Sequence, residues 1–77
     1  MEVKIYTSKT CTYCNQAKEF MRENNIDFEE LDVGTNADAR NELIAMGYRG
    51  VPVILVDGEE IQGFDRQRLM EVFEINE

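Results

Sequence analysis

The sequence predicts one α/β domain in which helices cover both faces of a four-stranded mixed sheet. Segments with the strand period of two residues alternate with segments of helical period, in the order β-α-β-α-β-β-α. Such alternation implies parallel strands joined by right-handed crossovers, and a late hairpin adds an antiparallel strand. The chain has 77 residues, 43% of them hydrophobic, enough for one small core. Residues 1–77 contain no repeat or linker, so we expect a single domain in three layers.

Short runs of alternating or β-branched residues predict four strands, over 2–7, 26–33, 51–56 and 59–62. At the N-terminus, polar and apolar residues alternate from Glu2 to Ile5. The run at 51–56 is rich in β-branched residues and fits a buried strand. The dipeptide Asp57-Gly58 is a strong hairpin signal, so the last two strands should pair with each other.

Apolar residues at helical spacing predict three helices. The first should cover 11–25, with a capping side chain from Ser8-Lys9-Thr10 and a stop at Asn24-Asn25. The second should cover 38–46 and end at Gly47. Each helix needs one apolar face, because the sheet buries only one side of it.

The third helix should begin after Asp65, whose side chain suits an N-cap. The apolar positions of all three helices are expected to face the core. They are Tyr13, Ala17, Phe20 and Met21 in the first helix, Ala39, Leu43, Ile44 and Met46 in the second, and Leu69, Met70, Val72 and Phe73 in the third.

The charge of the chain excludes several classes of partner. Acidic residues outnumber basic ones by 16 to 8, which gives a net charge of −8. This argues against binding to nucleic-acid phosphates or anionic membranes, since both interactions rest on Lys and Arg. Histidine is absent, so the commonest general base and metal ligand is missing. Residues 1–7 lack the apolar stretch of a secretory signal, which favours the cytoplasm.

The only cysteines are Cys11 and Cys14, and their spacing suits chemistry better than stabilisation. A disulfide across about 4 residues restricts the unfolded chain by roughly 2 kcal/mol, less than a longer loop would. The pair lies where the first helix should begin, and unpaired N–H groups and the helix dipole stabilise a thiolate there. Such positions lower the pKa of a thiol from about 8.5 to roughly 3.5–7.5. We expect Cys11, close to Lys9, to react, and Cys14 to be more enclosed.

Three motifs in this order resemble the glutaredoxin family of the thioredoxin superfamily, and the resemblance covers nearly the whole chain. They are Cys11-Thr12-Tyr13-Cys14 after a strand, Arg49-Gly50-Val51-Pro52 before a strand, and Gly63-Phe64-Asp65 before the last helix. The chain looks most like small bacterial and archaeal glutaredoxin-like redoxins, including those that serve ribonucleotide reductase. The resemblance implies a thioredoxin-like fold and reversible dithiol–disulfide exchange, with glutathione as co-substrate and no permanently bound cofactor.

The resemblance also implies roles for single residues. Cys11 is the implied nucleophile, and Cys14 is the implied resolving thiol. Pro52 corresponds to the family's cis-proline, which faces the cysteines. Next to it, Val51 would offer backbone hydrogen bonds to an extended peptide or to glutathione.

Further substrate contacts are implied on either side of the cysteines. Tyr13 would pack against the bound thiol substrate, and the resemblance brings Lys9 and Arg49 near the cysteines. The pair Gly63-Phe64 resembles the ribonucleotide-reductase-linked type, which thioredoxin reductase reduces. Asp65 resembles the glutathione-using type, in which it holds the γ-glutamyl amine.

The chain departs from the family pattern at several positions. Thr12 stands where members often have Pro, and Ser8 stands where many have a Lys or Arg that contacts the glycine carboxylate of glutathione. Gly50 replaces the Thr of the family's Thr-Val-Pro, and Gln62 replaces the first glycine of Gly-Gly-x-Asp. Both types of reductant therefore stay open.

The predicted function is a monomeric dithiol–disulfide oxidoreductase that reduces protein disulfides or glutathione mixed disulfides through Cys11 and Cys14. One alternative is an electron donor to ribonucleotide reductase that is itself reduced by a flavoprotein, thioredoxin reductase. Another is a dimeric iron–sulfur cluster or metal carrier, for which thiolates are suitable ligands. A tetrahedral zinc site needs four ligands, whereas one chain supplies two cysteines and no His, so we expect no metal site within a chain.

Overall fold

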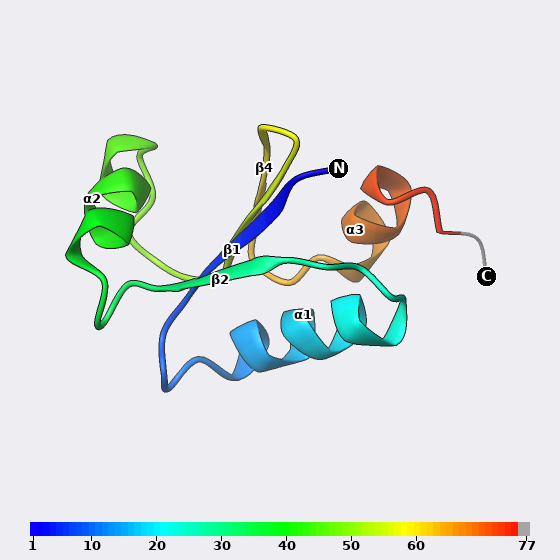
Figure 1. The fold of residues 1–77 in the computed structure, drawn as a ribbon, viewed down its shortest axis with the longest axis horizontal. Helices are drawn as coiled ribbons and strands as arrows, with labels where there is room; N and C mark the ends of the chain where they lie inside the picture. Colours follow the sequence, from blue (N-terminus) through cyan, green and yellow to red (C-terminus); the bar gives the residue numbers. More distant parts are fainter. Residues whose placement is uncertain (76–77) are drawn as a thin grey trace.

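The computed structural model describes residues 1–75, and its elements follow the predicted order (Figure 1). Four strands form one mixed sheet with helices on both faces, which confirms the predicted fold class. No helix within residues 1–75 has the length and apolar character needed to cross a membrane. The elements are β1 Val3–Thr7, α1 Thr12–Glu23, β2 Glu29–Asp32, α2 Ala37–Ala45, β3 Val53–Val56, β4 Glu59–Gln62 and α3 Arg66–Val72.

The strands lie in the order β2-β1-β3-β4. β1 and β2 are parallel, as the alternation of strand and helix predicts, and β3 and β4 form the expected antiparallel hairpin. β3 differs from the expectation, because it is antiparallel to β1. The chain returns from α2 to the end of the sheet at which β1 finishes, so Val53 pairs with Tyr6 and Val56 with Val3.

Two apolar clusters hold the layers together, one on each face of the sheet. In the first, α1 and α3 pack against β1, β3 and β4 around the fully buried Ile5, Met21 and Leu69. In the second, α2 packs on the opposite face through Ala39 and Leu43. Figure 1 shows α1 and α2 on opposite sides of the sheet.

Two residues expected in the core lie at the surface. Ile44 is 57% exposed, because Leu43 and Ala39 occupy the narrow face that the short α2 turns toward the sheet. Tyr13 is 62% exposed, and the adjacent Cys14 takes the buried position of the first turn of α1. Neighbouring helical residues point about 100° apart, so one of each pair faces solvent when the other faces the sheet.

The end of α1 follows its predicted signal, whereas β2 starts later than predicted. Asn24 caps α1 and Asn25 has a φ of 58°, so the helix stops where expected. β2 begins at Glu29 rather than residue 26, because its only partner is β1 and the pairing starts with Lys4 opposite Glu29. Before it, the N–H of Ile26 is bonded to the Met21 carbonyl of α1 (2.8 Å).

The remaining turns confirm the residues that predicted them. Gly47 follows α2 with a φ of 94°, a conformation in which a side chain is strained. Asp57 and Gly58 both have positive φ, as a two-residue hairpin of the primed type requires. Val51 and Pro52 precede β3 instead of belonging to it, so the predicted strand over 51–56 begins two residues later than expected.

Candidate active site

Cys11 and Cys14 form a disulfide at the start of α1, with their Cα atoms 5.2 Å apart. Cys11 is the N-cap of the helix, and its Sγ accepts the backbone N–H of Cys14 at 3.0 Å. The capping atom is therefore the cysteine sulfur, and the expectation that Ser8-Lys9-Thr10 supplies the cap is wrong. An N-cap side chain accepts from the amide three residues later, and the two-residue gap between the cysteines satisfies this spacing.

The two sulfurs differ in access. Cys14 is fully buried, because its position in the first turn of α1 faces the sheet. Cys11 is partly exposed. A disulfide that arrives from solvent therefore meets Cys11 first, and the expectation that Cys14 is the more enclosed of the two is confirmed.

A second segment, distant in sequence, comes against Cys11. The Val51–Pro52 peptide bond is cis, as the family resemblance implies, and the Val51 carbonyl oxygen lies 3.7 Å from Cys11 Sγ. The N–H of Gly63 donates to the Pro52 carbonyl (2.8 Å), which ties the end of β4 to this segment. Among residues 1–75 the N–H of Val51 has no partner, so it is free to bind an extended chain beside the disulfide.

The segment Gly63-Phe64-Asp65 connects β4 to α3. Gly63 has a φ of 79°, and the partly buried Phe64 packs its ring against Phe20 of α1 with centroids 6.0 Å apart. Asp65 is the N-cap of α3, where its carboxylate accepts the N–H of Arg68 at 3.0 Å. This confirms the predicted cap, and the ligand roles of these residues stay predictions.

Lys9, Tyr13 and Arg49 are exposed. Lys9 lies in the turn between β1 and α1, and Tyr13 lies in the first turn of α1 beside the disulfide. Arg49 lines a cavity of about 410 Å³ together with Arg40 of α2. Neither Lys9 nor Arg49 has an ion-pair partner among residues 1–75, and their substrate contacts stay predictions.

A polar cluster behind the cysteine helix was not predicted. One carboxylate oxygen of Glu30, on β2, accepts Thr7 Oγ1 at 3.0 Å and Lys18 Nζ at 2.9 Å. The hydrogen bond from Lys18 is the main cause that holds the pKa of Glu30 below its usual value of 4.5. Only the register of β2 on β1 brings Glu30 over α1, and the sequence pattern of β2 alone does not indicate this contact.

Replacing Glu30 with Gln should test this cluster through the pH dependence of stability. Because Lys18 lowers the pKa of Glu30 in the folded protein, the stabilisation is complete above pH 4.5 and is lost as the pH falls through the folded pKa. The Glu30 side chain is 38% exposed, so the effect at pH 7 should be at most about 1 kcal/mol. Urea unfolding should show this difference at pH 7 and little of it at pH 3.

The matched control is Glu29→Gln, which removes a neighbouring exposed carboxylate that has no ion pair within residues 1–75. Its effect on the free energy of unfolding should be smaller than that of Glu30→Gln at pH 7. An equal loss for Glu30→Gln at pH 7 and pH 3 would contradict the stabilising role of the charge.

A tyrosine joins α2 to the sheet on the opposite face. Tyr6 is 2% exposed, and its hydroxyl donates to Glu42 at 2.9 Å. Burial, followed by the hydrogen bond to Glu42, raises the pKa of Tyr6 to about 12. The phenol therefore stays protonated near neutral pH and holds α2 beside the end of β1 that leads to the cysteines.

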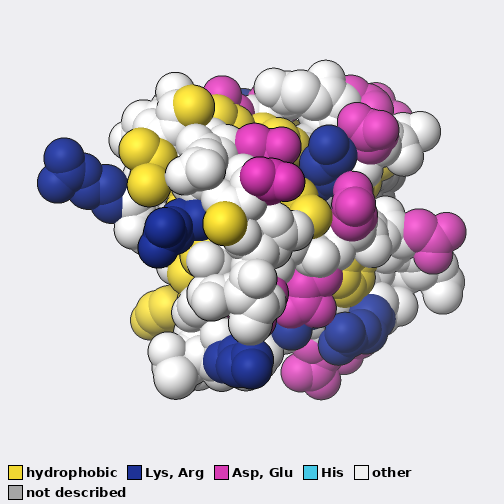
Figure 2. Space-filling model, turned by 60° about the vertical axis from the view of Figure 1, so that its left-hand side comes forward, with side chains coloured by type: hydrophobic (Ala, Val, Ile, Leu, Met, Phe, Trp, Pro, Cys, Tyr) yellow, Lys and Arg dark blue, Asp and Glu magenta, His cyan; other side chains and the backbone are white. Residues whose placement is uncertain are grey.

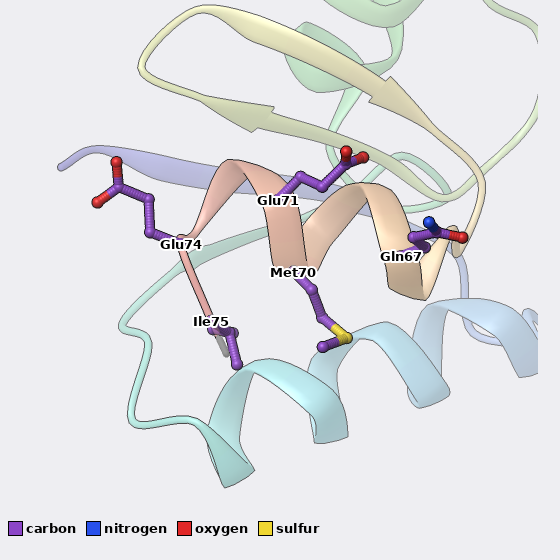
Figure 3. A pocket seen from close by; sticks show the side chains of 5 residues that line it. All are labelled: Gln67, Met70, Glu71, Glu74 and Ile75. Carbon is purple, nitrogen blue, oxygen red and sulfur yellow. The ribbon is translucent and has the colours of Figure 1, made fainter. Parts of the chain in front are cut away.

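A further cavity, of about 470 Å³, lies beside the C-terminal helix and contains none of the predicted site residues. Its lining side chains are Gln67, Met70, Glu71, Glu74 and Ile75. Figure 3 shows Met70 and Ile75 pointing toward α1, whereas Glu71 and Glu74 point away from it. Nowhere in residues 1–75 do three or more Cys, Asp or Glu side chains gather as a metal site.

Most of the described chain, including the cysteine pair, matches a known protein family. A family model of the glutaredoxins matches residues 3–61, which include both cysteines and the Val51–Pro52 segment. The chain belongs to the glutaredoxin family. The redox-active pair of this glutaredoxin is Cys11–Cys14, the disulfide at the start of α1.

Similar proteins extend the match over most of the chain. Glutaredoxin 3 of Escherichia coli strain K12 is 41% identical over 64 residues, which cover 82% of this chain and 77% of that protein. The thioredoxin-like protein BC3987 is 35% identical in sequence, and its crystal structure matches this one with a TM-score of 0.88. The match covers 92% of this chain and 99% of that one.

NrdH-redoxin from Escherichia coli, a glutaredoxin-like protein with a thioredoxin-like activity profile, is also similar. It is 27% identical with a TM-score of 0.84, and the match covers 100% of this chain and 97% of that one. These structures confirm the thioredoxin-like fold. This glutaredoxin thus resembles both a glutaredoxin and an NrdH-redoxin.

Proposed function

We propose that this glutaredoxin reduces protein disulfides or glutathione mixed disulfides by thiol–disulfide exchange. The Cys11 thiolate attacks one substrate sulfur, and the other substrate sulfur leaves as a thiolate and takes up a proton. Cys14 then loses its proton and attacks Cys11 Sγ. This attack expels the substrate sulfur that is still bonded to Cys11, and that sulfur takes up a proton. Two electrons have then passed to the substrate, and the Cys11–Cys14 disulfide remains. The single observation that carries this proposal is a partly exposed sulfur at the helix start bonded to a fully buried one.

Local geometry supports Cys11 as both nucleophile and leaving group. The N–H of Cys14 points at Cys11 Sγ from 3.0 Å, so a charge on this sulfur meets a donor already in place. A stabilised thiolate attacks only moderately better, because its intrinsic nucleophilicity falls with its pKa. It leaves much more readily, which favours release of Cys11 from a mixed disulfide.

The substrate backbone would bind beside the disulfide. The N–H of Val51, without a partner in residues 1–75, and its carbonyl oxygen near Cys11 Sγ suit a short extended segment. A protein disulfide and a glutathione adduct both present such a segment. We propose that the reaction takes place in a reducing compartment such as the cytoplasm, where the pair cycles and does not stay oxidised. One chain would suffice for it, since both sulfurs lie in the same helix turn.

The reductant is either glutathione or a flavoprotein of the thioredoxin-reductase type. Similarity to glutaredoxin 3 and the carboxylate of Asp65 favour glutathione. Similarity to NrdH-redoxin and the pair Gly63-Phe64 favour thioredoxin reductase, and with it a role as electron donor to ribonucleotide reductase. Paired assays on one disulfide substrate, with glutathione and its reductase in one and thioredoxin reductase in the other, separate these sources of electrons.

Variants of Asp65 sharpen this assay. Asp65→Asn keeps an N-cap of equal quality, so the free energy of unfolding should change by less than about 0.5 kcal/mol. It removes the charge that would hold the γ-glutamyl amine, so the rate with glutathione should fall roughly tenfold. Asp65→Ala should lose the same rate and, in addition, about 1 kcal/mol of stability.

With thioredoxin reductase as the electron source, Asp65→Asn should react at the wild-type rate, because that enzyme offers no γ-glutamyl amine. A wild-type rate for Asp65→Asn with glutathione would leave Asp65 as a helix cap only. Failure of the wild-type protein with both electron sources would contradict the proposed function itself.

A further inference from the structure

An apolar groove with two arginines at its margin lies on the α2 side of the molecule. Its cavity has about 410 Å³, within the range of ligand pockets, and is lined by Val33, Arg40, Leu43, Ile44 and Arg49. Arg40 and Ile44 are one helical turn apart and therefore neighbours on the surface of α2. Figure 2, which turns this side toward the viewer, shows hydrophobic side chains among Lys and Arg side chains along one margin, with most acidic groups elsewhere.

Both arginines of this groove lack an acidic partner, although the chain has 16 acidic residues. Three other basic side chains are engaged, Lys18 with Glu30, Arg68 with Glu59, and Arg22 over the ring of Phe28. Arg40 and Arg49 have no ion pair or hydrogen-bonded side chain among residues 1–75. Two unpaired cations beside an exposed Ile44 complement a ligand that is apolar at its centre and anionic at its ends.

The groove opens at the same end of the sheet as the disulfide. Arg49 is two residues before Val51, whose carbonyl oxygen lies 3.7 Å from Cys11 Sγ. On the other side, the N–H of Val33 is bonded to the carbonyl of Thr7, four residues before Cys11 (2.9 Å). A peptide that reacts at Cys11 and continues in extended form advances by roughly 3.3 Å per residue. A substrate peptide bonded to Cys11 therefore lies over α2 a few residues away from its own reacting cysteine.

We propose that this groove docks a segment of a protein substrate next to its reacting disulfide, namely one large apolar side chain between two carboxylates. The apolar side chain lies on Leu43 and Ile44, and the carboxylates pair with Arg40 and Arg49. The inference rests on the proposed exchange at Cys11. It adds that the groove determines which disulfide substrates react fastest. Glutathione has no large apolar side chain, so the groove favours protein disulfides over glutathione adducts.

Synthetic peptides test this selection in a single turnover. Each carries a Cys-x-x-Cys disulfide and, two residues away, the triplet Glu-Leu-Glu, Lys-Leu-Lys or Glu-Ser-Glu, placed before the disulfide in one set and after it in another. The protein is reduced with dithiothreitol, desalted and mixed with the oxidised peptide. Acid-quenched samples then give the amount of reduced peptide, so no reductase enters the assay. In at least one set, Glu-Leu-Glu should react about threefold to tenfold faster than either other triplet at low salt, and the advantage over Lys-Leu-Lys should shrink with added salt.

Variants assign the selection to the groove. Arg40→Glu should reverse the preference between the acidic and basic triplets, whereas Arg22→Glu, the same charge change on α1, should keep the wild-type ratio. Ile44→Ser should remove the difference between the Leu and Ser triplets. Each of these side chains is exposed, so the folded state should persist.

Equal rates for all triplets in both sets would overturn the docking proposal and leave the exchange reaction intact. The same holds if Arg40→Glu behaves like Arg22→Glu. If no peptide is reduced at all, the proposed function fails and not the groove alone. The two failures are therefore distinguishable in one experiment.

Discussion

Substituting Cys11 with Ser should lower the rate of disulfide reduction to the uncatalysed level, a loss of more than about a thousandfold. A hydroxyl at the start of α1 still accepts the N–H of Cys14, so the helix keeps its cap. It does not ionise near neutral pH and forms no disulfide, so both exchange steps are lost. The measurement is the single-turnover reduction of a peptide disulfide by the pre-reduced protein.

Cys14→Ser should separate two substrate classes. Reduction of a glutathione mixed disulfide needs only Cys11, because a second glutathione can release the first one from it. Reduction of a protein disulfide needs Cys14 to expel the bound substrate, so this variant should accumulate a stable mixed disulfide at Cys11. Mass spectrometry of the acid-quenched reaction detects that adduct.

The control for burial is Cys14→Ala, since Ser would place a hydroxyl at a fully buried position. Both variants should trap the same adduct. Full activity of Cys11→Ser with either electron source would show that another group carries the reaction. An adduct on Cys14 of the wild-type protein would reverse the two roles.

Features set by local chemistry were predictable from the sequence. Gly47, Asp57-Gly58 and Asp65 each act through their own backbone or side chain within a few residues, and each lies where its signal placed it. The cysteine pair belongs to the same class, because its sulfur bonds an amide three residues away. Even here the identity of the cap was missed, since Ser and Thr are the more familiar capping residues.

Features set by pairing between distant segments were not predictable in the same way. The direction of β3 follows from where the chain returns after α2, and no periodicity within residues 53–56 records that. The cluster around Glu30 exists because β2 aligns Glu30 with Ile5 and so turns it toward Lys18. A shift by one residue would turn the same carboxylate to the other face.

The groove on α2 shows why a periodic pattern alone misleads. The residues Ala39, Leu43 and Ile44 fit one helical stripe, yet the sheet covers only the first two. The stripe therefore predicts Ile44 in the core, whereas the packing leaves it exposed beside Arg40. An apolar residue that fits the stripe but lies outside the core is a candidate for contact with a partner.

Substituting Leu69 with Ala should lower the free energy of unfolding by about 3 kcal/mol, because a fully buried side chain leaves a cavity between α3, α1 and the sheet. A domain of 77 residues has a total stability of roughly 4–12 kcal/mol, so this is a large share. The midpoint of thermal unfolding should fall by roughly 12–24 °C. The matched control is Ile44→Ala, which should stay within about 0.5 kcal/mol of wild type, because Ile44 is exposed.

Hydrogen exchange in the same variant links the core to the site. The N–H of Gly63 donates to the Pro52 carbonyl. Gly63 lies two residues before Asp65, the N-cap at which α3 begins. If the packing of Leu69 holds α3 and thereby this contact, the amide of Gly63 should exchange faster in Leu69→Ala by more than the loss of global stability explains. If its exchange changes only as much as the global stability, the β3–β4 hairpin alone holds the Val51–Pro52 segment against Cys11. Loosening of α3 would then leave the geometry of the reacting sulfur unchanged.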